Sequence, residues 1–185
     1  HAEVEAEGQL FATDIGGVTG RAELRRKTIA ARVERAAKLV ANNPGPWIMW
    51  CALNSEADAL TAAIPGAVNV HGSLGAEYEP RLLLAFAHGD YDVLVTKPRL
   101  ARQGLNYQHC SRMAFVGLGD SYEQYYQAIR RCYRYGQTEV VRAHVIVSDL
   151  ESQIAANVAR KEQQASQITT ALVDEMKRVR ERVSV

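Results

Sequence analysis

Long hydrophobic runs are missing from this sequence of 185 residues. No apolar stretch approaches the roughly 20 residues that a membrane-spanning helix needs, so the sequence predicts no membrane partner. The N-terminal stretch is rich in glutamate, whereas a secretory signal peptide is basic and then apolar. We therefore expect a cytoplasmic protein with one core of ordinary size.

Cysteine is also scarce. The three cysteines, Cys51, Cys110 and Cys132, form an odd set without the spacing of metal ligands, so we predict no metal site and expect reduced, buried thiols. The net charge of +1 identifies no partner by itself. Arginines nevertheless concentrate around residues 21–35, 99–112, 130–142 and 178–182, and positive groups that converge on one surface are compatible with nucleic-acid binding.

Short apolar runs alternate with amphipathic stretches along most of the chain. The runs at 47–53, 67–72, 92–96, 112–117 and 140–148 predict strands, and the stretches at 55–64, 78–87 and 121–135 predict helices. Asn54 or Ser55 could cap the first of these helices. We expect a loosely ordered lead-in (1–18), an N-terminal helix (19–44), an α/β domain (45–150) and a C-terminal helical extension (151–185). A long helix at roughly 149–182 forms most of this extension.

Strands that are apolar throughout and alternate with helices predict a mostly parallel sheet with helices on both faces. Ligands of such sheets bind at the carboxyl ends of the strands. The segments after Cys51, Val70, Thr96 and Gly117 are therefore the first places to search for a site.

The segment 121–137 combines tyrosines and arginines. At helical spacing Tyr122, Tyr126, Ile129 and Tyr133 share one stripe, with Tyr125 and Cys132 beside it, which predicts a face packed into the core.

The opposite side of that predicted helix carries Gln127, Arg131 and Arg134, flanked by Arg130. No carboxylate stands four residues before any of these arginines, so the segment itself does not neutralise them. Three interpretations stay open: a solvated basic face, pairing with a carboxylate distant in sequence, or binding of phosphate.

The segment "QAIRRCYRYGQ" (127–137) resembles motif VI of superfamily 2 helicases, in the form of the Swi/Snf-like and phage-type branch. Upstream segments follow in the family's order. "WIMWCALNSEADAL" stands where motif IV is expected, "VHGSLGAEYEPRLLLAFAHGDYDVLVT" resembles the family's His-Gly loop and following helix, and "VLVTKPRLARQGLNYQHCSRMAFVG" resembles motif V. The resemblance covers about residues 45–150 and implies a RecA-like three-layer fold in a bacterial or phage-encoded protein.

The resemblance also implies roles for individual residues. Arg134 matches the arginine finger that reaches the γ-phosphate of ATP, and Arg131 matches its companion. On the nucleotide side the matching positions are Gln127, Gly104, Asn106 and Gln137. Motif V residues also contact the nucleic-acid backbone in the family, and the positions implied for nucleic acid are Thr96, Lys97, Arg99, His71 and Gly72. A structural role of the loop is an equal alternative for His71.

No G-x-x-x-x-G-K-[ST] loop occurs in the sequence, and no Asp-Glu pair follows a strand. Family members place both, with the ATP and Mg²⁺ that they bind, in a preceding P-loop domain, so we expect this chain to be the C-terminal half of a DNA helicase or translocase, inactive as an ATPase alone. A nucleic-acid-binding module without ATP turnover and an α/β interaction domain stay open as alternatives.

Overall fold

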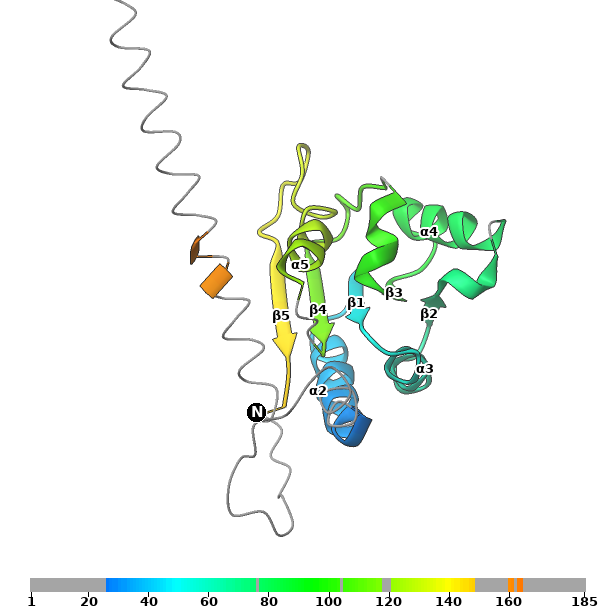
Figure 1. Ribbon diagram of the computed structural model, residues 1–185. Helices are drawn as coiled ribbons and strands as arrows, with labels where there is room; N and C mark the ends of the chain where they lie inside the picture. Colours follow the sequence, from blue (N-terminus) through cyan, green and yellow to red (C-terminus); the bar gives the residue numbers. More distant parts are fainter. Residues whose placement is uncertain are drawn as a thin grey trace, which may run out of the picture.

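The computed structural model describes residues 26–75, 77–103, 105–117, 121–148, 160–161 and 163–164. Within them one five-stranded sheet forms, in the order β2-β3-β1-β4-β5 (Figure 1). Its strands are β1 (Trp47–Cys51), β2 (Ala67–Val70), β3 (Val93–Thr96), β4 (Arg112–Val116) and β5 (Arg142–Ile146). Every pair of neighbours is parallel, which confirms the predicted α/β architecture.

Helices cover both faces of this sheet. Residues of α2 (Ile29–Ala41) and α3 (Asn54–Ala63) pack on one face, and residues of α4 (Tyr78–His88) and α5 (Tyr122–Ile129) pack on the other. Two short 3₁₀ segments, η1 (Gly72–Leu74) and η2 (Pro98–Gln103), follow β2 and β3. In the described part of the chain no helix is long and apolar enough to cross a membrane. The predicted lead-in, the start of the N-terminal helix and nearly all of the predicted C-terminal helix lie outside the described residues.

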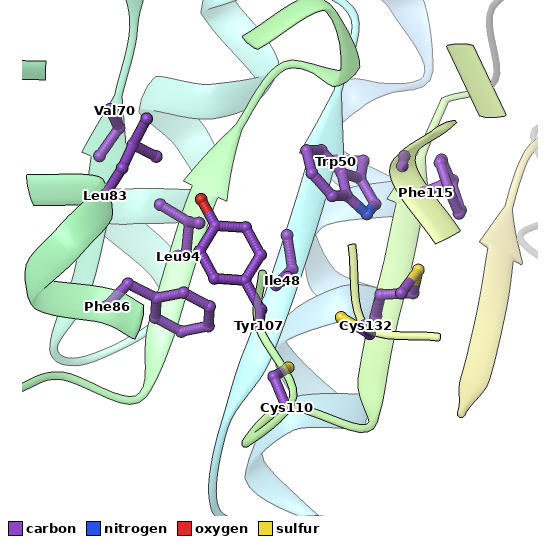
Figure 2. Packing of buried hydrophobic residues seen from close by; sticks show 12 residues of the cluster. Ile48, Trp50, Val70, Leu83, Phe86, Leu94, Tyr107, Cys110, Phe115 and Cys132 are labelled. Atoms are coloured by element: carbon purple, nitrogen blue, oxygen red, sulfur yellow. The ribbon is translucent and has the colours of Figure 1, made fainter. Parts of the chain in front are cut away.

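The strand period of two residues divides the core between the two faces. On β1, Ile48 and Trp50 point to the side of α4 and α5, where they meet Phe86 and Phe115 (Figure 2). Trp47, Met49 and Cys51 of the same strand point to α2 and α3, and all five β1 side chains are at most 1% exposed. Full burial of such side chains contributes roughly 1.5–3 kcal/mol each, so β1 anchors both layers.

The start of α3 differs from the expected cap. The helix begins at Asn54, and neither Asn54 nor Ser55 caps it; instead the Glu56 carboxylate accepts hydrogen bonds from the backbone N–H groups of Ala52 and Leu53, both at 2.9 Å. Carboxylates in the first turn stabilise a helix by satisfying its free N–H groups and by opposing its dipole. The reason for the difference is tertiary, because Glu56 also binds Arg32 of α2.

Arg32 and Glu56 form an ion pair of 2.7 Å, and both side chains are 0% exposed. The guanidinium of Arg32 also donates to the Thr28 hydroxyl at 3.2 Å. Gly117, directly after β4, has φ +81°, and a Cβ there would stand 2.5 Å from Arg32 Nη1 and 2.9 Å from Glu56 Oε1. A glycine is therefore required where β4 passes over the pair, which ties α2 and α3 to the carboxyl end of the sheet.

Candidate functional site

The predicted site residues lie at the two ends of the parallel strands: the carboxyl edge of the sheet, where the strands end, and the amino edge, where they begin. His71, Gly72, Thr96, Lys97 and Arg99 follow or end β2 and β3 at the carboxyl edge. The loop 105–111 instead leads into β4, and the turn 130–137 precedes β5. Because Arg112 and Arg142 are register partners at the first residues of those strands, both segments lie at the amino edge. The strand pattern predicts a site at the carboxyl ends of the strands. The structure instead places Arg131 and Arg134 at the amino edge.

The helix before the arginines is shorter than predicted. The Ser121 hydroxyl accepts the N–H of Gln124 at 3.3 Å and caps α5, but the helix ends at Ile129 and not near residue 135. Beyond it the backbone N–H groups of Arg131 and Cys132 bond to the carbonyls three residues back, those of Ala128 and Ile129. The chain continues as the irregular turn 130–137, in which the carbonyl of Arg131 accepts the backbone N–H of Tyr107 from the neighbouring loop at 2.8 Å.

Arg131 is a buried cation. The residue is only 8% exposed, its Nη1 donates to the carbonyl of Leu105 at 3.2 Å, and its Nε has no hydrogen-bond partner. Burial lowers the pKa of its guanidinium, and the nearby positive charge of Arg134 lowers that pKa further. Of the three interpretations left open by the sequence, a solvated face therefore does not describe Arg131, because its side chain is buried.

Arg134 lies beside Arg131 and is exposed. Its Nη1 donates to Asn106 Oδ1 at 2.5 Å, which joins a motif VI position to a motif V position. Among the residues that the structure describes, no carboxylate forms an ion pair with Arg130, Arg131 or Arg134. The local sequence offers these arginines no neutralising carboxylate, and the described part of the fold offers none either.

A groove opens at the amino edge. Its described wall has two cations, Arg130 and Arg134, and no acidic residue. Its walls come from the loop 105–111 and from the turn 130–137, and the lining residues are Asn106, Gln108, Arg130, Tyr133, Arg134, Tyr135, Gly136 and Gln137. The Gln108 amide donates to the carbonyl of Tyr135 at 2.7 Å, and Gly136 has φ +94°. The groove therefore has a fixed rim with two exposed guanidiniums, which suits an anion.

The remaining nucleotide-side residues contribute unequally. Gln137 donates from Nε2 to the carbonyls of Cys110 and Cys132, at 3.2 and 3.4 Å, and so holds the turn against the loop. Gln127 is exposed on α5 and is not part of the groove wall. Gly104 lies outside the described residues.

The packing face that the periodicity predicted is confirmed only in part, since Tyr122, Tyr125, Ile129 and Cys132 pack into the core but Tyr126 and Tyr133 do not. Tyr126 is 43% exposed, Tyr133 is 63% exposed and Tyr135 is fully exposed. The side of α5 that meets the core carries Tyr122, Tyr125, Ala128 and Ile129, with Tyr125 4.7 Å from Phe115 between ring centroids. Since α5 ends at Ile129, the helical spacing that placed Tyr133 on the stripe no longer applies.

The carboxyl-edge group surrounds two small cavities of about 180 Å³ each. Lys97 lines both, and Arg99 lines the one that also borders the first turn of α5 at Ser121 and Gln124. Lys97 Nζ donates to Asn54 Oδ1, and Arg99 is exposed. Two cations close to a helix N-terminus form an edge that favours negatively charged groups.

Two predicted nucleic-acid residues serve the fold directly. Thr96 is 2% exposed, and its hydroxyl donates to the carbonyl of Val70 at 2.8 Å, across to the neighbouring strand. His71 Nδ1 and Ser73 Oγ are 2.7 Å apart within the loop after β2. Gly72 is exposed in the same loop. Both Thr96 and His71 line the second cavity, which Asp58 borders as well.

The Arg32–Glu56 pair beneath the carboxyl edge could not be predicted from the sequence, because its partners are 24 residues apart and no local pattern joins them. Within the described ranges no group of three or more His, Cys, Asp or Glu residues could hold a metal ion.

Comparison with known proteins bears on this arrangement. Residues 31–136, more than half of the chain, match the family described as "Helicase conserved C-terminal domain". The chain belongs to this family. The predicted superfamily 2 helicase domain is thereby confirmed, and a search of curated proteins finds no match.

Solved structures agree with a helicase C-terminal domain at the level of the fold. The C-terminal part of the Fun30 ATPase domain is 15% identical with a TM-score of 0.62, over 69% of this chain and 45% of that one. The C-terminal domain of the DEAD-box protein Dbp5 is 20% identical with a TM-score of 0.60, over 71% of this chain and 78% of that one. The RNA helicase Prp28 from Chaetomium thermophilum, bound to ADP, is 19% identical with a TM-score of 0.61, over 75% and 35%.

These likenesses confirm the RecA-like fold of the helicase C-terminal domain. The chain spans less than half of the Fun30 and Prp28 structures that it matches. The family is one of ATP-dependent, nucleic-acid-binding helicases.

Proposed function

We propose that this helicase C-terminal domain is half of an ATP-dependent DNA translocase. In this proposal the amino-edge groove presents Arg134 as arginine finger, and Arg131, buried beside it, is its companion. The γ-phosphate that they approach belongs to ATP held by a P-loop domain of the same parent protein. The carboxyl edge contributes part of the grip on the nucleic-acid backbone.

The observation that supports this proposal most is the uncompensated arginine pair. Burying a guanidinium without a counter-ion costs free energy, and placing a second guanidinium beside it adds repulsion. Arg131 nevertheless is nine-tenths buried, has an unsatisfied Nε and lies next to Arg134. An arriving anion would supply the missing negative charge, and planar guanidiniums bind phosphate oxygens through paired donors. An arrangement that is costly when empty is typical of a binding site.

The other nucleotide contacts must come from elsewhere, since the printed sequence has no P-loop to surround the β- and γ-phosphates. No described residues form a metal cluster, so we assign Mg²⁺ to the same P-loop domain. The contribution of this chain is then electrostatic. Arg134 and Arg131 stabilise the charge that develops on the γ-phosphoryl oxygens, an effect of about 10³–10⁵ in rate in comparable systems.

The nucleic-acid grip rests on Lys97 and Arg99, the two cations of the carboxyl-edge cavities. Their side chains suit phosphates of the backbone, which position a protein without reading sequence. The buried Thr96 hydroxyl supports the end of β3, and His71 and Gly72 border the same edge.

Two packed segments connect the edges. Helix α5 runs from Ser121, in the wall of the first cavity, to the turn that holds Arg131 and Arg134. The chain of η2, packed against α5, runs from Arg99 toward Asn106. Closure on ATP at one edge can thereby shift the grip at the other, which is the coupling that translocation requires.

ATP hydrolysis by the parent protein, with its P-loop domain, tests the proposal through Arg134→Ala. We expect turnover stimulated by DNA to fall by about 10³-fold or more while ATP binding persists. Arg35→Ala, which removes an exposed arginine of α2, is the matched control and should leave turnover unchanged. Unchanged turnover in Arg134→Ala would show that the arginine pair is not the finger. The isolated chain should hydrolyse no ATP.

A second function, binding of nucleic acid without ATP turnover, is favoured by the carboxyl-edge cations alone. They do not depend on the arginine pair, so binding by the isolated chain with no turnover by the parent protein would support it. The choice of DNA rests on the Gly136-Gln137 ending that resembles the Swi/Snf-like branch. Competition between duplex DNA and RNA of equal length tests that choice, and a preference for RNA would overturn it.

A further inference from the structure

Two buried cysteines meet between the loop 105–111 and the turn 130–137. Cys110 stands just before β4 and Cys132 just after α5, and both are 0% exposed (Figure 2). They are separated by 22 positions in the sequence, and the proposed ATPase mechanism uses neither thiol.

The side chain of Gln137 joins the backbone carbonyls of the two cysteines. A single donor, Gln137 Nε2, reaches the carbonyl of Cys110 at 3.2 Å and that of Cys132 at 3.4 Å. The Tyr107 N–H bond to the Arg131 carbonyl, at 2.8 Å, fixes the same two segments one step away. Together with the bonds from Gln108 to Tyr135, from Arg131 to Leu105 and from Arg134 to Asn106, these hydrogen bonds keep loop and turn together around the thiols.

The thiols also interact with each other. The hydrogen bond from the Cys132 thiol lowers the pKa of Cys110, in spite of burial, and the same bond together with burial raises the pKa of Cys132. Cys51, which is buried as deeply in the opposite layer, has its pKa raised to about 12 by burial. Cys110 is therefore the sulfur best suited to attack, with Cys132 as its neighbour, while Cys51 is inert.

We propose that Cys110 and Cys132 are a redox-active dithiol, which a low-molecular-weight disulfide oxidises to an intramolecular disulfide that fastens the loop 105–111 to the turn 130–137. The Cys110 thiolate attacks one sulfur of the small disulfide, forms a mixed disulfide and releases one small thiol. Cys132 then attacks the Cys110 sulfur and releases the second small thiol. Two electrons and two protons pass from the protein to the small disulfide, which is reduced to two thiols.

The proposed disulfide would lie next to Arg131 and Arg134. Cys132 directly follows Arg131, and Arg134 is bound to Asn106 of the same loop. A covalent bond between loop and turn would limit the movement of both guanidiniums. The chemistry of the dithiol, however, does not depend on the proposed ATPase, so the two proposals can fail separately.

The test uses the full chain with Cys51→Ala, incubated under native conditions with oxidised glutathione and followed by intact mass. We expect a loss of about 2 Da without a glutathione adduct. The further change Cys132→Ala should instead leave one glutathione on Cys110, and the further change Cys110→Ala should leave the chain unmodified. Circular dichroism verifies that each variant is folded.

Access to the buried thiols requires the turn to open. Gln137→Ala removes the two hydrogen bonds that reach the backbone carbonyls of both cysteines, so oxidation should accelerate by about 10-fold. After oxidation, amide hydrogen exchange in residues 130–137 should slow, while exchange in α3 should not change. Stable glutathione adducts on the Cys51→Ala chain, or no oxidation of its folded form, would overturn the proposal.

Discussion

Replacing Arg131 by methionine should stabilise this domain while it destroys the site. The guanidinium is 8% exposed, its Nε lacks a partner, and no described carboxylate neutralises it. Leaving such a donor unsatisfied costs about 1–3 kcal/mol or more for a charged group, and the bond from the charged guanidinium to the Leu105 carbonyl returns about 1.5–3 kcal/mol. Methionine has a similar length without the charge, so the free energy of unfolding should rise by about 1 kcal/mol.

Urea unfolding measures this change through the fluorescence of the two buried tryptophans. A gain of about 1 kcal/mol raises the midpoint by roughly 0.3–1 M at the usual slopes. The matched control is Arg134→Met, at an exposed position, where the stability should change by less than about 0.5 kcal/mol. Inorganic pyrophosphate should stabilise the unmodified chain and not Arg131→Met. A loss of more than about 1 kcal/mol in Arg131→Met would refute the reasoning, because the arginine would then be a structural residue.

Two further predictions concern the carboxyl edge. Glu56→Gln should lower the free energy of unfolding by about 3–5 kcal/mol, because it removes the carboxylate charge from an ion pair of 2.7 Å whose two side chains are 0% exposed; a loss below about 1 kcal/mol in urea unfolding would contradict a fully buried pair. Lys97→Ala combined with Arg99→Ala should weaken DNA binding and reduce the slope of log K against log salt by about 1.8, or about 0.9 for each lost phosphate contact. Fluorescence anisotropy across a salt series measures that slope, and an unchanged slope would exclude this edge as the grip.

Much of the fold could be predicted from local patterns. The apolar runs located all five strands within a few residues, because residues such as Ile48 and Trp50 alternate with Trp47 and Met49 between two buried faces. The helix at 121–135 was predicted too long because its periodicity continued, whereas α5 ends at Ile129 and the turn after it bonds to Tyr107. That error placed Tyr133 in the core, where the structure leaves it exposed; Tyr126 is exposed too, although it lies within α5.

The candidate site shows the same division. The order of the helicase motifs and the lack of acidic neighbours around Arg131 and Arg134 are properties of the sequence alone. Their position at the amino edge, with Asn106 bound to Arg134, required the path of the chain from η2 back to β4.

By itself the sequence determined the parallel sheet, its two helical layers and the family, since hydrophobic period and motif order are written along the chain. The tertiary structure alone decided that Arg32 meets Glu56, that Arg131 is buried and that Cys110 lies against Cys132. Each of these depends on contacts between segments distant in sequence. Local propensity does not encode them, because the free energy of a buried charge or thiol is set by the neighbours that folding brings to it.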